Sequence, residues 1–201
     1  MRRVDLFRMH AKEYAAEKEP RFVQTTRAQY LMLDGCGAPG SAVFATAIAT
    51  LYSVAFTTKM AHKAGGRHDY AVGKLEALWW TKSNRGASMP RSQWQWRLMI
   101  RTPAFVTKDE VKKAIVVLMQ RKKDAGVKDV HLDMLEEGEC VQAQHVGPYD
   151  RESQTFAAME SFARSQGRTF CGAHHEIYLS DPRRVDPARL KTILRHPVQQ
   201  E

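Results

Sequence analysis

The stretch HHEIYLSD, residues 174–181, decides how the rest of the chain is interpreted. Its β-forming residues lie between a glycine and an Asp-Pro pair, which predicts a strand. Side chains alternate along a strand, so His174, Glu176 and Tyr178 share one face and the apolar residues take the other. A carboxylate and a phenol on one face are costly unless that face is polar or binds a ligand. The stretch therefore predicts one wall of a binding site.

A second predicted strand, residues 72–80, repeats this pattern. Alternation places Glu76 and Trp80 on one face, and Trp79 on the opposite face, where we expect it to pack in the core. Glu76 and Glu176 occupy equivalent strands, so we expect the two strands to form the walls of one cleft. Trp80 is then the tryptophan expected to line it.

The pattern of apolar residues, caps and turns predicts an α+β fold with antiparallel sheets. A Gly/Ser/Pro-bearing loop separates the strands over 70–81 and 93–101, which together predict a long hairpin with a mobile tip. Elements are expected as strands at 21–34, 70–81, 93–101, 130–135, 140–146 and 174–180, helices at 41–64, 111–124 and 150–165, and a short helix beginning near residue 186.

The order of these elements contains a repeat of strand, helix, strand and strand. One unit spans about residues 21–101 and a second about 107–181, with the strand at 130–135 available to complete the second unit. We expect two pseudo-symmetric units with a ligand groove between them. Residues 1–20 form a charged accessory segment, and residues 21–201 form a single domain.

Composition and charge narrow the function further. The chain has 201 residues, 43% of them hydrophobic, which argues against disorder. Its formal charge of +9 is dispersed rather than gathered beside a recognition motif, so it does not predict nucleic-acid binding. No apolar run predicts a membrane span, and because no apolar stretch follows Arg2 and Arg3 we expect no signal peptide.

The cysteines and histidines predict neither a disulfide framework nor a metal site. Three widely spaced cysteines suit a reducing compartment, so we expect a cytoplasmic protein with free thiols. The chain has no zinc-type spacing of cysteine and histidine, and we predict no cofactor. The oligomeric state is left open.

Four strings along the chain together resemble the GyrI-like small-molecule-binding domain, over about residues 21–197. They are YLMLDG at 30–35, KLEALWW at 74–80, HVGPYD at 145–150 and EIYLSDPRR at 176–184. The double tryptophan and the Asp-Pro-Arg-Arg ending resemble its stand-alone branch. The resemblance implies a pseudo-two-fold pair of units and a groove whose buried glutamate, matched by Glu176, attracts cationic aromatic compounds. Some stand-alone relatives resemble hydrolases that open cyclopropane-bearing alkylating compounds.

These arguments single out two sets of residues. We expect Glu176 to act on the ligand with a pKa raised by its partly dry pocket, and Tyr178 to hydrogen-bond it or the ligand. Flat aromatic ligands would stack on tryptophans, and a cation would gain from both ring and carboxylate. The candidate catalytic residues are Glu176, Tyr178 and Glu76, and the candidate ligand-binding residues are Trp80, Trp79, Trp94, Trp96, His174 and Tyr149.

Three functions fit these residues. The first is a stand-alone protein that binds small aromatic or cationic molecules. The second is an enzyme on the same groove, in which a glutamate helps water add to a strained, electrophilic ligand, as in detoxification. The third is a protein-interaction module, such as an inhibitor of a DNA-handling enzyme, which would use the basic surface. The sequence does not separate binding from catalysis, because both use the same residues.

Overall fold

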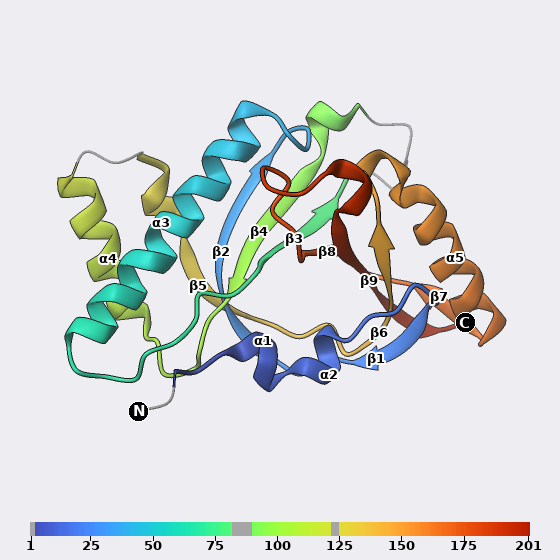
Figure 1. Ribbon diagram of the computed structural model, residues 1–201, viewed down its shortest axis with the longest axis horizontal. Helices are drawn as coiled ribbons and strands as arrows, with labels where there is room; N and C mark the ends of the chain where they lie inside the picture. Colours follow the sequence, from blue (N-terminus) through green and yellow to red (C-terminus); the bar gives the residue numbers. More distant parts are fainter. Residues whose placement is uncertain (1–2, 82–89, 122–124) are drawn as a thin grey trace. The chain divides into compact units, whose positions relative to one another are not determined.

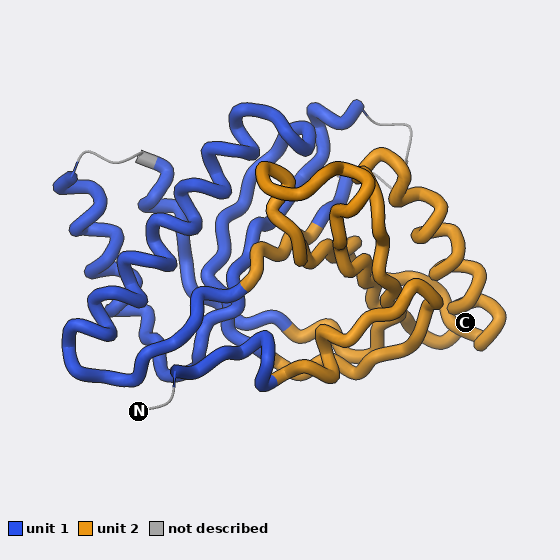
Figure 2. Tube along the Cα trace, viewed as in Figure 1, with its two compact units in different colours: residues 1–9, 28–73, 79–135 blue, residues 10–27, 74–78, 136–201 orange. Residues whose placement is uncertain are grey.

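The computed structural model describes residues 3–81, 90–121 and 125–201. The chain forms two compact units, shown in different colours in Figure 2. Unit 1 comprises residues 1–9, 28–73 and 79–135, and unit 2 comprises residues 10–27, 74–78 and 136–201.

Unit 1 contains four strands in the order β3–β4–β2–β5. Strand β2 pairs antiparallel with both β4 and β5. The elements of unit 1 are α1 (Leu6–Met9), β2 (Ala28–Cys36), α3 (Ala42–Ala64), the last two residues of β3 (Leu75–Trp80), a 3-10 turn (Arg91–Gln93), β4 (Gln95–Arg101), α4 (Lys108–Gln120), a second 3-10 turn (Ala125–Asp129) and β5 (His131–Leu135).

The long helix α3 is the main core element of unit 1. It begins where the Ser41 hydroxyl accepts a hydrogen bond from the backbone N–H of Phe44, as expected for an N-cap. Leu51 and Val54 are fully buried, and the helix packs on β2 and β4. Although α3 is long and apolar enough to cross a membrane, a core helix meets the same criteria. Its buried face packs on β2 and β4, as in a helix that covers one face of a sheet.

Unit 2 has the strand order β1–β6–β9–β8–β3, with β7 also paired to β9. The pairs β1–β6, β6–β9, β8–β9 and β7–β9 are antiparallel. Its elements, labelled in Figure 1, are α2 (Ala11–Tyr14), β1 (Arg21–Gln24), the first part of β3, β6 (Glu139–Val146), a 3-10 turn (Tyr149–Arg151), α5 (Glu152–Ser165), β7 (Arg168–Phe170), β8 (His174–Tyr178), a 3-10 turn (Pro187–Arg189) and β9 (Lys191–Gln200).

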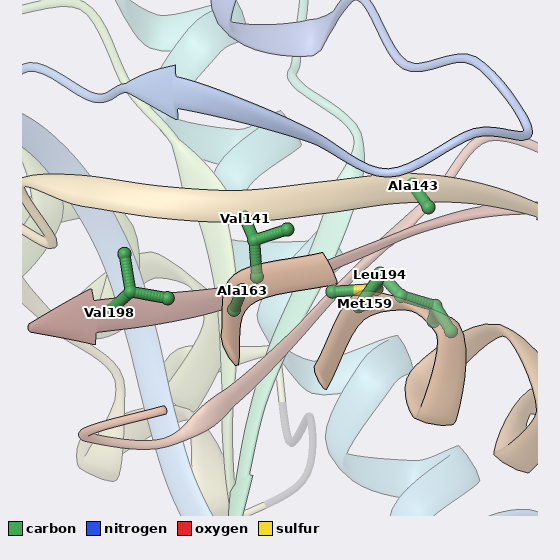
Figure 3. Packing of buried hydrophobic residues seen from close by; sticks show 6 residues of the cluster. All are labelled: Val141, Ala143, Met159, Ala163, Leu194 and Val198. Carbon is green, nitrogen blue, oxygen red and sulfur yellow. The ribbon is translucent and has the colours of Figure 1, made fainter. Parts of the chain in front are cut away.

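Helix α5 covers one face of the sheet in unit 2. Its Met159 and Ala163, both fully buried, pack against residues of β6 and β9, among them Val141 and Leu194. Figure 3 shows these side chains meeting between the helix and the two strands. This contact identifies the face of the sheet to which Leu194 belongs, and that face also carries the candidate site.

The predicted α+β class with antiparallel strands is confirmed, and so are the helices expected at 41–64 and 150–165. The strand–helix–strand–strand order occurs as β2–α3–β3–β4 in the first half of the chain, whereas in the second half β6 and α5 are followed by three strands, β7, β8 and β9. The tip of the predicted hairpin, residues 82–89, lies outside the described residues.

Two expectations about the second half of the chain are wrong. Asp186 starts only a three-residue turn, and the ten-residue strand β9 follows where a short helix was expected. The strand at 130–135 does not complete the second repeat, because β5 pairs with β2. Pairing with β6 on one side and β8 on the other holds residues 191–200 extended, and this long-range constraint outweighs the local helix signal.

The face of unit 2 away from α5 contains a buried ionic network centred on His175, which is 0% exposed. Its Nδ1 lies 2.9 Å from Glu137 Oε2 and its Nε2 lies 3.1 Å from Glu76 Oε2. Burial alone would lower the pKa of His175, but Glu137 and Glu76 raise it to about 9. Burial would likewise raise the pKa of Glu137, but His175 and Arg195 lower it to about 2.

The network also holds the N-terminal segment. The Tyr14 hydroxyl donates to Glu76 at 2.8 Å. The Arg195 guanidinium donates to the backbone carbonyl of Glu13 at 2.7 Å and to the Gln142 side chain at 3.0 Å. Residues from α2, β3, β6, β8 and β9 therefore depend on one set of buried charges.

Replacement of His175 by glutamine should lower the free energy of unfolding by about 3–5 kcal/mol near pH 6, because it leaves buried carboxylates without their cation. The folded pKa of His175 lies above its unfolded value, so its contribution is complete below about pH 6.5. It is lost as the pH rises through about 9. Urea unfolding at several pH values measures this difference.

The difference in stability between the parent and His175→Gln should therefore shrink between pH 6.5 and 9.5 (roughly the interval between the two pKa values). His131→Gln, at an exposed position of β5, is the matched control and should change little at any pH. A loss of stability that stays constant across this range would contradict a charged, network-bound His175.

Candidate functional site

The α5-facing side of β8 carries three polar side chains. In the antiparallel ladder with β9, Glu176 lies opposite Leu194 and Tyr178 opposite Thr192. Residues that lie directly opposite each other point to the same face, and Leu194 packs against α5. Glu176, Tyr178 and, by alternation, His174 therefore lie on the α5 face, as the sequence predicts. The side chains of Glu176 and His174 are 13% and 19% exposed.

Hydrogen bonds and ring contacts connect these side chains into one cluster. The Tyr178 hydroxyl donates to Glu176 Oε2 at 2.6 Å, and His174 Nε2 lies 3.5 Å from Glu176 Oε1. The ring of Tyr149 meets that of Tyr178 edge to face, with centroids 6.0 Å apart. The structure thus brings together four of the residues singled out from the sequence, and we call them the Glu176 cluster.

Glu152 joins the Glu176 cluster, although the sequence did not single it out. Burial, followed by the negative charge of Glu176, raises the pKa of Glu152 to about 9. Burial, followed by the charges of Glu152, Glu176 and Asp181, also raises the pKa of Tyr149 to about 12. Glu152 is therefore neutral at pH 7, and it adds a bound proton to the cluster.

The start of α5 explains why Glu152 was missed. The helix expected at 150–165 begins at Asp150, a residue type that favours the N-cap position, and this placed Glu152 in an ordinary first turn. In the structure a 3-10 turn precedes α5, and Arg151 takes the N-cap position without a side-chain hydrogen bond. The remaining signal was the three-residue spacing between Tyr149 and Glu152, which suits side chains on one side of a helical turn.

Glu76 does not belong to the Glu176 cluster. It is 1% exposed, and its two carboxyl oxygens accept hydrogen bonds from Tyr14 and interact with His175. Since His175 and Glu176 are neighbours on β8, their side chains point to opposite faces of the sheet. The two glutamates expected in one cleft therefore face opposite sides of unit 2, and Glu76 serves the buried network.

The predicted tryptophans belong to unit 1. Trp79 and Trp96 contact Phe44 of α3, with ring centroids 5.2 and 5.5 Å apart, and are 6% and 2% exposed. Trp94 contacts Trp79 at 6.0 Å. Trp80 points to the other face of β3 and is 37% exposed. Within unit 1, Trp79 and Trp96 are core residues, and Trp80 is the one open to solvent.

Other polar residues near the cluster have structural roles. His145, on β6, lies 2.9 Å from the Thr155 hydroxyl and 3.2 Å from the carbonyl of Pro148, and so holds the turn that leads to Tyr149. Among the residues that the structure describes, no group of three histidine, cysteine or acidic side chains is arranged to hold a metal ion.

The Glu176 cluster can hold a positively charged or polarised ligand. A partly buried carboxylate attracts a cation more strongly than one in water, since the local dielectric constant is lower. The faces of Tyr149 and Tyr178 add cation–π attraction. Glu152, in its neutral form, can donate a hydrogen bond or a proton to a bound molecule.

Comparison with known proteins places the chain in a family. A model of the GyrI-like small-molecule-binding domain matches residues 19–199. A search of curated proteins found no match. An uncharacterized conserved protein from Listeria innocua is 36% identical, with a TM-score of 0.91, over 98% of this chain and 100% of that one.

Two further structures are similar. A hydrolase from Listeria innocua is 36% identical over 98% of this chain and all of its own, with a TM-score of 0.87. The C-terminal domain of EcmrR has a TM-score of 0.63 and covers 91% of this chain and 98% of its own, but at 10% identity it shows the fold alone. The match of the family model to almost the whole chain, with close relatives of the same length, shows that this protein belongs to the GyrI-like small-molecule-binding domain family.

Proposed function

We propose that the protein binds aromatic small molecules, cationic or electrophilic, at the Glu176 cluster, and that it hydrolyses those that carry a strained electrophilic ring. One observation carries the proposal: Glu176, 13% exposed, is held by the Tyr178 hydroxyl beside aromatic rings. Membership of this family implies that the ligand is a small molecule. The chemical class of that ligand is part of our proposal.

The arrangement of Glu176 supports an aromatic and cationic ligand. The hydrogen bond from Tyr178 occupies Oε2, and Oε1 faces the more distant His174. A ligand with a positive centre can approach this carboxylate while its ring packs against tyrosine. Burial of that ring adds about 25 cal/mol per Å² of apolar surface removed from water.

Hydrolysis is supported by the same carboxylate and by the relatives. Two similar proteins from Listeria innocua, 35% and 36% identical, are described as hydrolases. Here Glu176 would accept a proton from the water that attacks the strained ring, for example a cyclopropane in an alkylating compound. General base catalysis of this kind contributes about 10²–10⁴-fold to a rate.

The consequence for the cell would be detoxification. Water added to an electrophilic ring leaves an alcohol that no longer alkylates other molecules. Cys36, Cys140 and Cys171 are free, which suits our proposal of a cytoplasmic location. The protein would then remove such compounds in the compartment that holds most of their targets.

Binding of a cation should depend on the charge of Glu176. Benzyltrimethylammonium and its uncharged isostere neopentylbenzene differ in one central atom, nitrogen against carbon. Glu176→Gln should weaken binding of the cation about tenfold or more, because two charges about 4 Å apart attract by roughly 4 kcal/mol at an effective dielectric constant near 20, partly offset by desolvation. It should leave the uncharged ligand almost unaffected. Titration calorimetry measures both affinities.

Glu160→Gln is the matched control, because Glu160 is an exposed carboxylate on α5 that pairs with Arg164. It should change neither affinity. If Glu176→Gln binds benzyltrimethylammonium as tightly as the parent does, the assignment of Glu176 as the cation-binding group is wrong.

Turnover should appear as the gain of one water. A spirocyclopropyl cyclohexadienone, which water opens to tyrosol, is a small electrophile of the proposed class. The parent should convert it to a product heavier by one water, and Glu176→Gln should be slower by about 10²–10⁴-fold. Mass spectrometry of the reaction follows this conversion. Binding of the dienone without any accelerated ring opening would contradict the hydrolytic part of the proposal.

A further inference from the structure

Buried polar atoms without a hydrogen-bond partner gather around Glu176. Among the described residues, Glu152 Oε1, Thr192 Oγ1 and His174 Nδ1 are buried and have no such partner. His174 lies beside Glu176, Thr192 lies opposite Tyr178 in the sheet, and Glu152 interacts electrostatically with Glu176. Buried polar groups in folded proteins are nearly always hydrogen-bonded, so several unpartnered atoms at one place indicate a position for a bound polar group.

Thr192 forms the floor of this position. It lies on β9 directly opposite Tyr178, on the α5 face, and is 1% exposed. Its hydroxyl lies near enough to Glu152 to favour the charged form of that carboxyl slightly, yet the two groups do not meet in hydrogen-bonding geometry. A polar atom of a ligand or a water molecule between them would satisfy both.

Glu152 contributes another buried oxygen to this position. It is the first residue of α5, and the groups around it come from three further elements. Glu176 lies on β8, Thr192 lies on β9, and Tyr149 lies on the 3-10 turn before the helix.

We propose that Glu152 is a second catalytic residue of this site, the proton donor to the atom that gains electrons when water opens the substrate. This inference rests on the proposed hydrolytic function and deepens it. Glu176 and Glu152 then have opposite tasks: Glu176 accepts a proton from water, and Glu152 supplies one to the substrate.

The reaction balances with one water and no other reactant. The water oxygen forms a bond to a ring carbon of the cyclopropane, and one water proton passes to Glu176. The strained carbon–carbon bond breaks, and its electron pair moves through the conjugated ring to the carbonyl oxygen. That oxygen takes the proton from Glu152 and becomes a phenol. Transfer of a proton from Glu176 back to Glu152 restores the site.

The proton donor narrows the class of substrate. An acid in the site accelerates ring opening when the electron pair ends on an oxygen that must be protonated, as in a cyclopropyl dienone or an epoxide. It gives little help to a halide, which leaves as a stable anion. We therefore infer that the substrates are strained, uncharged or cationic electrophiles that carry such an oxygen.

The protonation of Glu152 agrees with this role. Burial and the charge of Glu176 raise its pKa to about 9, even though the N-terminus of a helix favours a carboxylate. Glu152 thus keeps its proton at pH 7 and can release it to a developing oxyanion. The loss of this proton predicts that turnover falls as the pH rises through about 9.

Three measurements on the full chain test the proposal. With the spirocyclopropyl dienone as substrate, Glu152→Gln should be about 10²–10⁴-fold slower than the parent at pH 7 and should lose the fall in rate near pH 9. The infrared carbonyl band of a protonated carboxylic acid should be present in the parent at pH 7 and absent in Glu152→Gln. Benzyltrimethylammonium should bind both proteins, which shows that the variant is folded and its site intact.

Glu160→Gln, on the same helix, should match the parent in all three measurements. Full turnover by Glu152→Gln, or a parent without the Glu152 acid band, would overturn the inference while leaving the role of Glu176 in place. Failure of the parent to open the dienone would instead overturn the proposed hydrolysis together with the role of Glu152 in it. The two failures are distinguishable because only the first leaves Glu176-dependent turnover.

Discussion

A buried histidine between two carboxylates is the interaction on which unit 2 depends. His175 has no exposed surface, and its two ring nitrogens lie 2.9 and 3.1 Å from Glu137 and Glu76. Such a set of charges is stable only when every member keeps its partner, because one unpaired buried charge costs several kcal/mol. Arg195 and Tyr14 complete the set and extend it to the N-terminal segment. The orientation of β8 follows from these contacts.

The orientation of β8 in turn determines the candidate site. With His175 directed into the network, its neighbour Glu176 must point to the α5 face. The two faces of the strand then differ in the partners that their buried polar side chains have. On the network face both carboxyl oxygens of Glu76 and one of Glu137 have short contacts to Tyr14 or His175, and Glu137 Oε1 is buried without a partner. On the α5 face Glu152 Oε1, Thr192 Oγ1 and His174 Nδ1 are buried without partners beside one another. A buried group without a partner calls for an explanation, such as a catalytic role or a bound ion or water molecule.

Much of this arrangement could be predicted from the sequence, where local rules decide it. Alternation along residues 174–178 correctly placed Glu176 and Tyr178 on one face, and the Ser41 cap located the start of α3. Glu152 could not be found in this way, because its importance comes from burial beside Glu176. The partners of Glu76 lie 62 and 99 residues away, and no local pattern reports such contacts. Strand β9 was missed for the same reason, since pairing with β6, β8 and β7 holds it extended.

A crystal structure of the protein with benzyltrimethylammonium bound would test the central claim most directly. The account predicts that the ammonium lies against the carboxylate of Glu176 on the α5 face of β8, with its ring against Tyr149 or Tyr178. A bound ligand that leaves Glu176 untouched, or that lies on the face of the His175 network, would contradict it.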